Sequence, residues 1–283
     1  MRIILILALF ILSLHAKALF SNAHQVESGI YIEALKNLVV ATQKTRGSTN
    51  AYINGNESAL LLIYSYKSDM KKAIGTMESL SMSEDPVINT RATAISRSLI
   101  ALNNKSLKLS AEEAFEAYTE NISQILMLAQ TVSQKNAENL NPFGKEVAAF
   151  MMGTILPLSE NIGQLRALGS GAAARATLNK KQLAQLEALL SEIEYTSSLY
   201  FANMRALNEK YKSNYKTDMG KSLALSEKSL EKFILLTKEK VLKEVPTMDS
   251  SEYFEKATDE ITAIMAIFDI NNKAIMEDSK GWI

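Results

Sequence analysis

Apolar residues recur every three or four positions along almost the whole chain, the spacing that gathers them on one face of an α-helix. No segment alternates apolar and polar residues in the manner of a half-buried β-strand, so no sheet is expected. Short polar or proline-containing stretches separate the periodic segments. The pattern predicts eight helices, at about residues 24–53, 57–80, 86–103, 111–134, 142–176, 180–211, 219–245 and 250–280.

Several of the predicted helices begin with residues that can satisfy free backbone N–H groups. Ser110 and Glu113 have the spacing of a capping box, and Asn141 and Asn179 are N-cap residues for the fifth and sixth helices. Pro157 lies inside the fifth helix, where it removes one backbone hydrogen bond and should bend the helix.

Connections between the predicted helices are short, which favours antiparallel neighbours. The polar stretch 136–141 divides the helices into two sets of four, at about residues 24–135 and 142–280. We therefore expect an all-α fold, in which about eight antiparallel helices form two packed four-helix bundles.

The N-terminus has the features of a secretory signal peptide. Arg2 precedes an unbroken apolar run over residues 3–14, and Ala16-Lys17-Ala18 fits the small-x-small cleavage pattern. Cleavage after Ala18 would leave residues 19–283 as an exported, soluble, periplasmic protein. The alternative is an uncleaved N-terminal membrane anchor, although the run is shorter than the roughly 20 apolar residues that span a bilayer.

Charge and composition exclude several functional classes. The 31 Lys and Arg residues balance the 31 Asp and Glu residues, so no excess of basic charge indicates a nucleic-acid partner. The chain has no cysteine, and its two histidines, His15 and His24, lie in no catalytic or metal-binding motif. We expect no metal, no cofactor and no enzymatic activity.

Two arginines stand where the helical pattern calls for apolar side chains. Arg46 continues the face that carries Leu38 and Thr42, and Arg166 follows Ile162 by one helical turn. Arginine is scarce in this chain, because only seven of the 31 basic residues are arginines. An arginine kept on an apolar face is therefore expected to have a specific partner.

Physical chemistry restricts what that partner can be. A buried guanidinium stays protonated and needs a negative group opposite it. Its planar fork of N–H donors suits a flat anion with two oxygens at matching spacing. Two forks at one place would exceed the charge of a single internal carboxylate and suit a diffusible oxyanion. The alternatives at each site are pairing with an internal Asp or Glu, or extension of the head group to water.

Three hydroxyl groups near these arginines are further candidates for ligand binding. Ser48 and Thr49 follow Arg46, and Ser170 lies one turn after Arg166. The alternative is that these side chains bond back to the carbonyl groups of their own helical turn.

Three segments resemble the nitrate- and nitrite-sensing (NIT) domain family. QKTRGS at 43–48 resembles its Q-x-x-R-G-x segment, IGQLRAL at 162–168 its G-x-x-R-A-L segment, and SEYFEKATDEI at 251–261 its last helix. The resemblance covers nearly all of the chain after the predicted signal peptide. It implies an all-α domain of two bundles that binds nitrate or nitrite between them, with Arg46 and Arg166 as the anion-binding pair.

We therefore expect a periplasmic sensor or binding protein for a small inorganic oxyanion, nitrate or nitrite first. Members of the family usually precede a signalling output, whereas this chain ends shortly after its last predicted helix. We expect the signal to pass to a partner such as a membrane-bound sensor kinase or chemoreceptor, and a homodimer is also compatible with the sequence. The alternative is a helical structural or adaptor protein without a small ligand, in which both arginines pair with internal carboxylates.

Overall fold

The computed structural model describes the backbone of residues 2–136 and 140–280 and the side chains of residues 26–135 and 140–278. The described backbone consists of helices and short connections, with no β-strand. The first half contains α1 (Arg2–Ile53), α2 (Ala59–Glu78), the 3₁₀ turn η1 (Ser81–Glu84), α3 (Pro86–Lys105), the 3₁₀ turn η2 (Ser106–Lys108) and α4 (Ala111–Asn136). The second half contains α5 (Pro142–Phe150), the π-turn η4 (Met151–Ile155), α6 (Leu156–Arg175), α7 (Lys180–Lys210), the 3₁₀ turn η5 (Lys212–Asn214), α8 (Met219–Lys240) and α9 (Ser250–Lys280).

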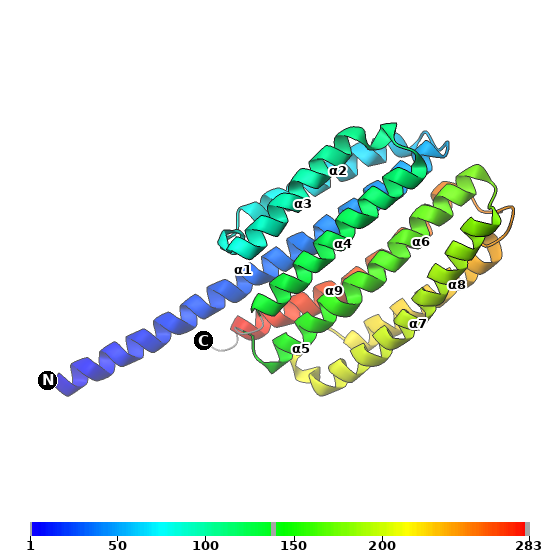
Figure 1. Cartoon of the computed structure of the whole chain (residues 1–283). Coiled ribbons are helices and arrows are strands. Elements are labelled where there is room, and N and C mark those ends of the chain that lie inside the picture. The colour runs from blue at the N-terminus through cyan, green and yellow to red at the C-terminus, as the bar shows by residue number, and fades with distance from the viewer. Residues whose placement is uncertain (1, 137–139, 281–283) are drawn as a thin grey trace.

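The helices form two four-helix bundles that lie side by side (Figure 1), with the contiguous segments α5, η4 and α6 counted as one helix. In the first bundle, α1 packs against α2 and α4, and α3 packs against α4. In the second, α6 packs against α7 and α9, and α8 packs against α7 and α9. The predicted all-α fold of two packed bundles is confirmed.

The two bundles meet where α1 lies against α6 and α9. Glycine makes this close approach possible. A Cβ atom on Gly163 would lie 3.1 Å from Arg46 Nη2, and one on Gly47 would lie 2.7 Å from Phe254 Cε2. A Cβ atom on Gly169 would lie 2.2 Å from Tyr253 Cε1. These contacts leave no room for a side chain, so the glycines fix how closely the helices approach.

The predicted caps are present in the structure. The backbone N–H of Glu113 donates to Ser110 Oγ at 3.2 Å, and that of Gly144 donates to Asn141 Oδ1 at 2.9 Å. Asn179 forms a reciprocal capping box with Gln182 at the start of α7. The helix starts predicted from these residues are therefore correct, because each cap satisfies donors that the first turn leaves free.

Two predicted boundaries differ from the structure. α8 ends at Lys240 and not near residue 245, because the N–H of Leu242 bonds to Thr237 O and the carbonyl of Glu244 accepts from Leu178 N at 2.9 Å. The segment after α8 is thus hydrogen-bonded to the connection between α6 and α7. The fifth predicted helix is also divided, since the π-turn η4 stands immediately before the turn that contains Pro157. A proline disrupts the α-helical bonding of the preceding turn, and a wider turn accommodates it.

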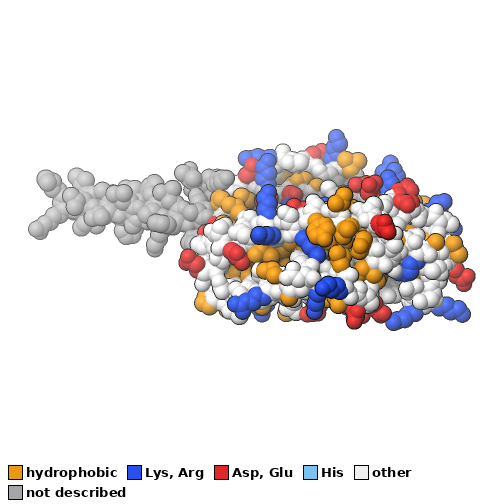
Figure 2. Space-filling view, turned by 90° about the horizontal axis from the view of Figure 1, so that it is seen from above, with side chains coloured by type: hydrophobic (Ala, Val, Ile, Leu, Met, Phe, Trp, Pro, Cys, Tyr) orange, Lys and Arg blue, Asp and Glu red, His pale blue; other side chains and the backbone are white. Residues whose placement is uncertain are grey.

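The first helix extends further back than residue 24, since α1 begins at Arg2. The predicted signal peptide, residues 1–18, lies outside the residues whose side chains are described, and its cleavage stays a prediction. Within the part of the chain that the structure describes, no helix offers an apolar stretch sufficient to traverse a bilayer. Acidic and basic side chains are intermixed on the face shown in Figure 2, as the balanced charge of the sequence leads one to expect.

Candidate anion-binding site

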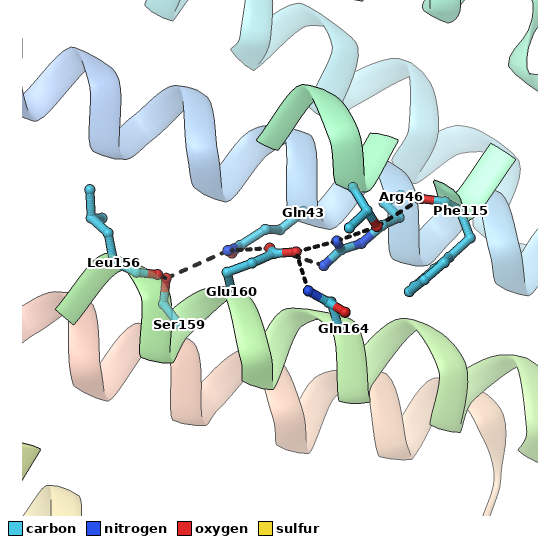
Figure 3. Close-up of polar contacts among 8 residues, drawn as sticks. Gln43, Arg46, Phe115, Leu156, Ser159, Glu160 and Gln164 are labelled. Carbon is cyan, nitrogen blue, oxygen red and sulfur yellow. Dashed lines mark hydrogen bonds and ion pairs between the residues drawn. The ribbon is translucent and has the colours of Figure 1, made fainter. Parts of the chain in front are cut away.

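Arg46 on α1 is buried at the boundary between the bundles and forms a two-pronged ion pair with Glu160 on α6 (Figure 3). Its Nη1 lies 2.5 Å from Glu160 Oε1, and its Nη2 lies 3.2 Å from Oε2. Only 1% of Arg46 and 6% of Glu160 is exposed. The Glu160 carboxylate thus accepts from the guanidinium fork with both of its oxygens, as was expected for a planar oxyanion.

Two amide side chains hold Glu160 in place. Gln43 Nε2 on α1 donates to Glu160 Oε2 at 3.1 Å, and Gln164 Nε2 on α6 donates to Oε1 at 3.0 Å. Glu160 therefore accepts hydrogen bonds from both sides of the bundle boundary (Figure 3). Glu160 is thus held by three side chains, those of Arg46, Gln43 and Gln164.

Arg166 on α6 is fully buried, but it has a neutral partner. Its Nη1 donates to Thr258 Oγ1 on α9 at 2.8 Å, and the Phe254 ring covers the guanidinium with its centre 4.6 Å from Cζ. Its Nε and Nη2 have no hydrogen-bond partner in the part of the chain that the structure describes. No carboxylate among the described residues forms an ion pair with it. Arg166 thus presents one complete edge of two parallel N–H donors without an acceptor.

The surroundings of the two arginines are equivalent in sequence and in structure. Arg46 Nη1 also donates to a threonine, Thr119 Oγ1 on α4, at 2.9 Å, and the Phe115 ring lies 5.2 Å from its Cζ. Each threonine hydroxyl donates to the carbonyl of the phenylalanine four residues before it. The sequences are FEAYT at 115–119 and FEKAT at 254–258. Each half therefore contributes the same arrangement of Arg, Phe and Thr, from α1 and α4 in the first half and from α6 and α9 in the second.

One position breaks this equivalence. Glu160 stands six residues before Arg166, and the residue six positions before Arg46 is Val40. Val40 is seven residues before Gly47, so both residues lie on the same face of α1. At Gly47, this face of α1 approaches Arg166 Nε. The carboxylate that pairs with Arg46 therefore has an apolar residue as its counterpart in the other half.

Electrostatics connect the two arginines. Burial lowers the pKa of Arg166 to about 9, the positive charge of Arg46 acts in the same direction, and Tyr66 and Glu160 oppose it. Arg166 still carries its charge at neutral pH. The three charged groups Arg46, Arg166 and Glu160 consequently interact at the centre of the domain, with two positive charges and one negative charge.

The predicted hydroxyl groups are all buried. Within residues 26–135 and 140–278, Ser48 Oγ and Ser170 Oγ have no hydrogen-bond partner, and the Ser170 carbonyl accepts from Ser250 Oγ. Neither hydroxyl bonds back to its own turn as Thr45 does to Ala41 O. Thr49 is fully buried beside Tyr118, and its Oγ1 likewise has no hydrogen-bond partner among the described side chains. Ser48 and Ser170 thus have hydroxyl groups available for a ligand.

A half-buried lysine, Lys44 on α1, lies close enough to Arg166 for their charges to interact. Burial lowers the pKa of Lys44, with a further contribution from Arg166, and Asp69 opposes both effects. Lys44 Nζ lies 5.4 Å from the centre of the Tyr66 ring. Lys44, Asp69 and Val40 also line a cavity of about 520 Å³ between α1 and α2.

The structure thus separates the two predicted arginines. At Arg46 the internal carboxylate weighed in the sequence analysis is present, and at Arg166 it is absent from the described residues. Sequence reasoning missed Glu160, although it is the only acidic residue between 147 and 186 and lies in an apolar helix. It also missed the F-E-x-x-T repeat, which is visible in the sequence.

The fold and its buried positive centre define an all-helical domain of two bundles that meet at a boundary with two buried arginines. The family described as nitrate and nitrite sensing (NIT) matches residues 37–269, which include both arginines and Glu160. The chain belongs to this family. The resemblance inferred from three short segments is confirmed over most of the chain.

A solved structure with the same fold is that of the NasR transcription antiterminator. The TM-score is 0.68, the sequence identity is 15%, and the match covers 96% of this chain and 75% of that chain. At this identity the likeness shows the shared fold alone. A comparison with curated proteins found no sequence match.

Proposed function

We propose that the chain senses nitrate or nitrite by binding the anion at Arg166, at the boundary between the two bundles, with Arg46 on the opposite side. The observation that carries this proposal is the free edge of a fully buried guanidinium, formed by Arg166 Nε and Nη2. Membership of the nitrate and nitrite sensing family supplies the ligand class.

An anion at this edge resolves an unfavourable feature of the unliganded protein. A buried charge without a partner costs several kcal/mol even after relaxation. Two oxygens of a planar oxyanion can accept from the two parallel N–H groups, which form short charge-assisted hydrogen bonds. Ser48, Thr49 and Ser170 are weaker polar ligands in this proposal, because each is buried and lies within about one helical turn of Arg46 or Arg166 along its helix.

The ligand would connect elements of both bundles. Arg46 belongs to α1, Arg166 to α6, and the groups that hold Arg166 belong to α9. An anion held among them favours one relative orientation of the bundles, provided that this orientation binds it more tightly than others do. In this proposal the domain is periplasmic and relays the change to a partner, a membrane-bound sensor kinase or chemoreceptor, with a homodimer as a further assembly.

Calorimetric titration of the protein with sodium nitrate and sodium nitrite, at constant ionic strength set with chloride, tests the proposal. Saturable binding to the wild type and its loss in Arg166→Met are expected. Arg97→Met is the matched control, because Arg97 is exposed and its replacement should leave binding unchanged. Absence of binding to the wild type, or unchanged binding to folded Arg166→Met, would refute the site.

The Arg46–Glu160 pair favours a second function, that of a helical structural or adaptor protein. In that case the pair fastens the two bundles and no anion binds. Arg46→Ala does not separate the two functions, since loss of Glu160's partner destabilises the protein under either one. Thermal melting does, because a ligand at a hundred times its Kd adds about 2.7 kcal/mol of stability, whereas a structural protein shows only general salt effects.

A further inference from the structure

The buried centre of the domain carries one net positive charge. Arg46 and Arg166 contribute two positive charges, and Glu160 contributes one negative charge. Lys44 and Asp69, at the edge of this centre, have opposite signs and offset each other. Glu260 on α9 is buried too, but it faces α8, where Ser229 Oγ donates to its Oε1 at 2.6 Å.

The single negative charge is fixed in place. Glu160 is bonded to Arg46, Gln43 and Gln164, so its carboxylate occupies the fork of Arg46 and leaves the edge of Arg166 open. The equivalent position in the other half is Val40, which supplies no second carboxylate. Because Glu160 has the uncharged Val40 as its counterpart in the other half, the buried centre keeps one positive charge, which a ligand must neutralise.

We propose that Glu160 makes this site selective for monovalent over divalent anions. This inference rests on the proposed function and concerns the same site. One monovalent oxyanion brings the buried centre to zero net charge. A divalent anion such as sulfate leaves one uncompensated negative charge out of water, which is strongly unfavourable. Two substitutions of opposite effect test this charge rule.

Glu160→Gln removes the negative charge with little change in shape. The buried centre then carries two net positive charges and matches a divalent anion. We expect the affinity for sulfate relative to nitrate to rise at least tenfold over the wild-type ratio. Glu160→Asp keeps the charge and should keep the preference for nitrate. Glu146→Gln is the matched control, since Glu146 is exposed and pairs with Lys210.

Val40→Glu adds a carboxylate at the equivalent position in α1. The net charge of the centre then becomes zero without a ligand, and nitrate affinity should fall at least tenfold. Val40→Gln is the control of the same size and polarity without the charge. It should bind nitrate within about threefold of the wild type.

Calorimetric titrations of each folded variant with nitrate and with sulfate, at equal ionic strength, give the affinity ratios. An unchanged ratio in Glu160→Gln, or undiminished nitrate binding by folded Val40→Glu, overturns the inference. If Glu160→Gln is unfolded without anion, helical circular dichroism is followed as each salt is added. Stronger recovery with sulfate supports the inference, and equal or no recovery overturns it.

The controls separate this inference from the proposed function. If the wild type binds neither nitrate nor nitrite, the proposed function fails and this inference fails with it. If the wild type binds nitrate but the ratios do not respond to Glu160, the proposed function stands and the charge rule alone is wrong.

Discussion

Arg166 and Thr258 are joined by a hydrogen bond of 2.8 Å from Nη1 to a hydroxyl oxygen, and this neutral group is the hydrogen-bond partner of a completely buried guanidinium. The Thr258 hydroxyl proton is itself donated to Phe254 O. The contact therefore orients the guanidinium without neutralising it. This uncompensated positive charge should lower the stability of the unliganded protein.

Arg166→Met should stabilise the protein in the absence of nitrate and nitrite. The substitution removes an uncompensated buried charge and keeps a flexible apolar chain of similar length, so a gain of about 1–4 kcal/mol is expected. Urea unfolding in chloride buffer measures it. Arg97→Met should change stability little, and a marked loss of stability in Arg166→Met would indicate a negative partner for Arg166.

Arg46→Met should have the opposite effect. It leaves Glu160 buried with only amide donors, and the expected loss is about 3–5 kcal/mol. The double variant Arg46→Met, Glu160→Met should recover most of this loss, since both charges are then absent. The exposed pair of Arg205 and Glu227 is the reference, where Arg205→Met should cost only about 0–1 kcal/mol. Additive effects in the double variant would contradict direct pairing.

Gly169→Ala should weaken the contact between α6 and α9. The new Cβ atom would lie 2.2 Å from Tyr253 Cε1, and a buried aromatic ring has little space to move. Overpacking of this kind costs about 1–3 kcal/mol. Gly75→Ala in α2 is the comparison, since its Cβ atom would meet nothing within 4 Å. There the helix should gain about 0.5–1 kcal/mol, because alanine restricts the unfolded chain.

Glu260→Gln should alter the dependence of stability on pH. Burial raises the pKa of Glu260, so ionisation of this carboxyl is less favourable in the folded protein than in the unfolded one. Its destabilising effect is absent below the unfolded pKa and develops as pH rises through the folded pKa. The variant should therefore be more stable than the wild type at pH 7 and show a smaller difference at pH 4. Urea unfolding at both pH values measures this, with the exposed Glu255→Gln as control.

Local features of the fold could be predicted from the sequence because they depend on neighbouring residues. Ser110, Asn141 and Asn179 cap the helices that their spacing indicates. The end of α8 could not, since it depends on a bond between Glu244 and Leu178 from a distant connection. The periodic pattern continues past Lys240, but tertiary contacts end the helix there.

The candidate site, like the fold, could be predicted from the sequence only in part. Both arginines could be identified as interior positions, because each interrupts an apolar helix face. Which of them has a resident carboxylate could not be deduced, since the pairing of Arg46 with Glu160 depends on how α1 and α6 cross. The contacts of Phe115 and Phe254 with the two guanidinium groups also could not be predicted, because they depend on how α4 and α9 pack.

The π-turn at residues 151–155 determines the direction in which the rest of α6 faces. A π-turn holds one residue more than the corresponding α-helical turn, and each residue rotates the helix by about 100°. Deleting one residue from this turn would turn every later side chain of α6, Glu160 and Arg166 included, toward different neighbours. One extra residue in the turn just before these charged side chains thereby sets the rotation of α6 about its axis, on which their contacts with α1 and α9 depend.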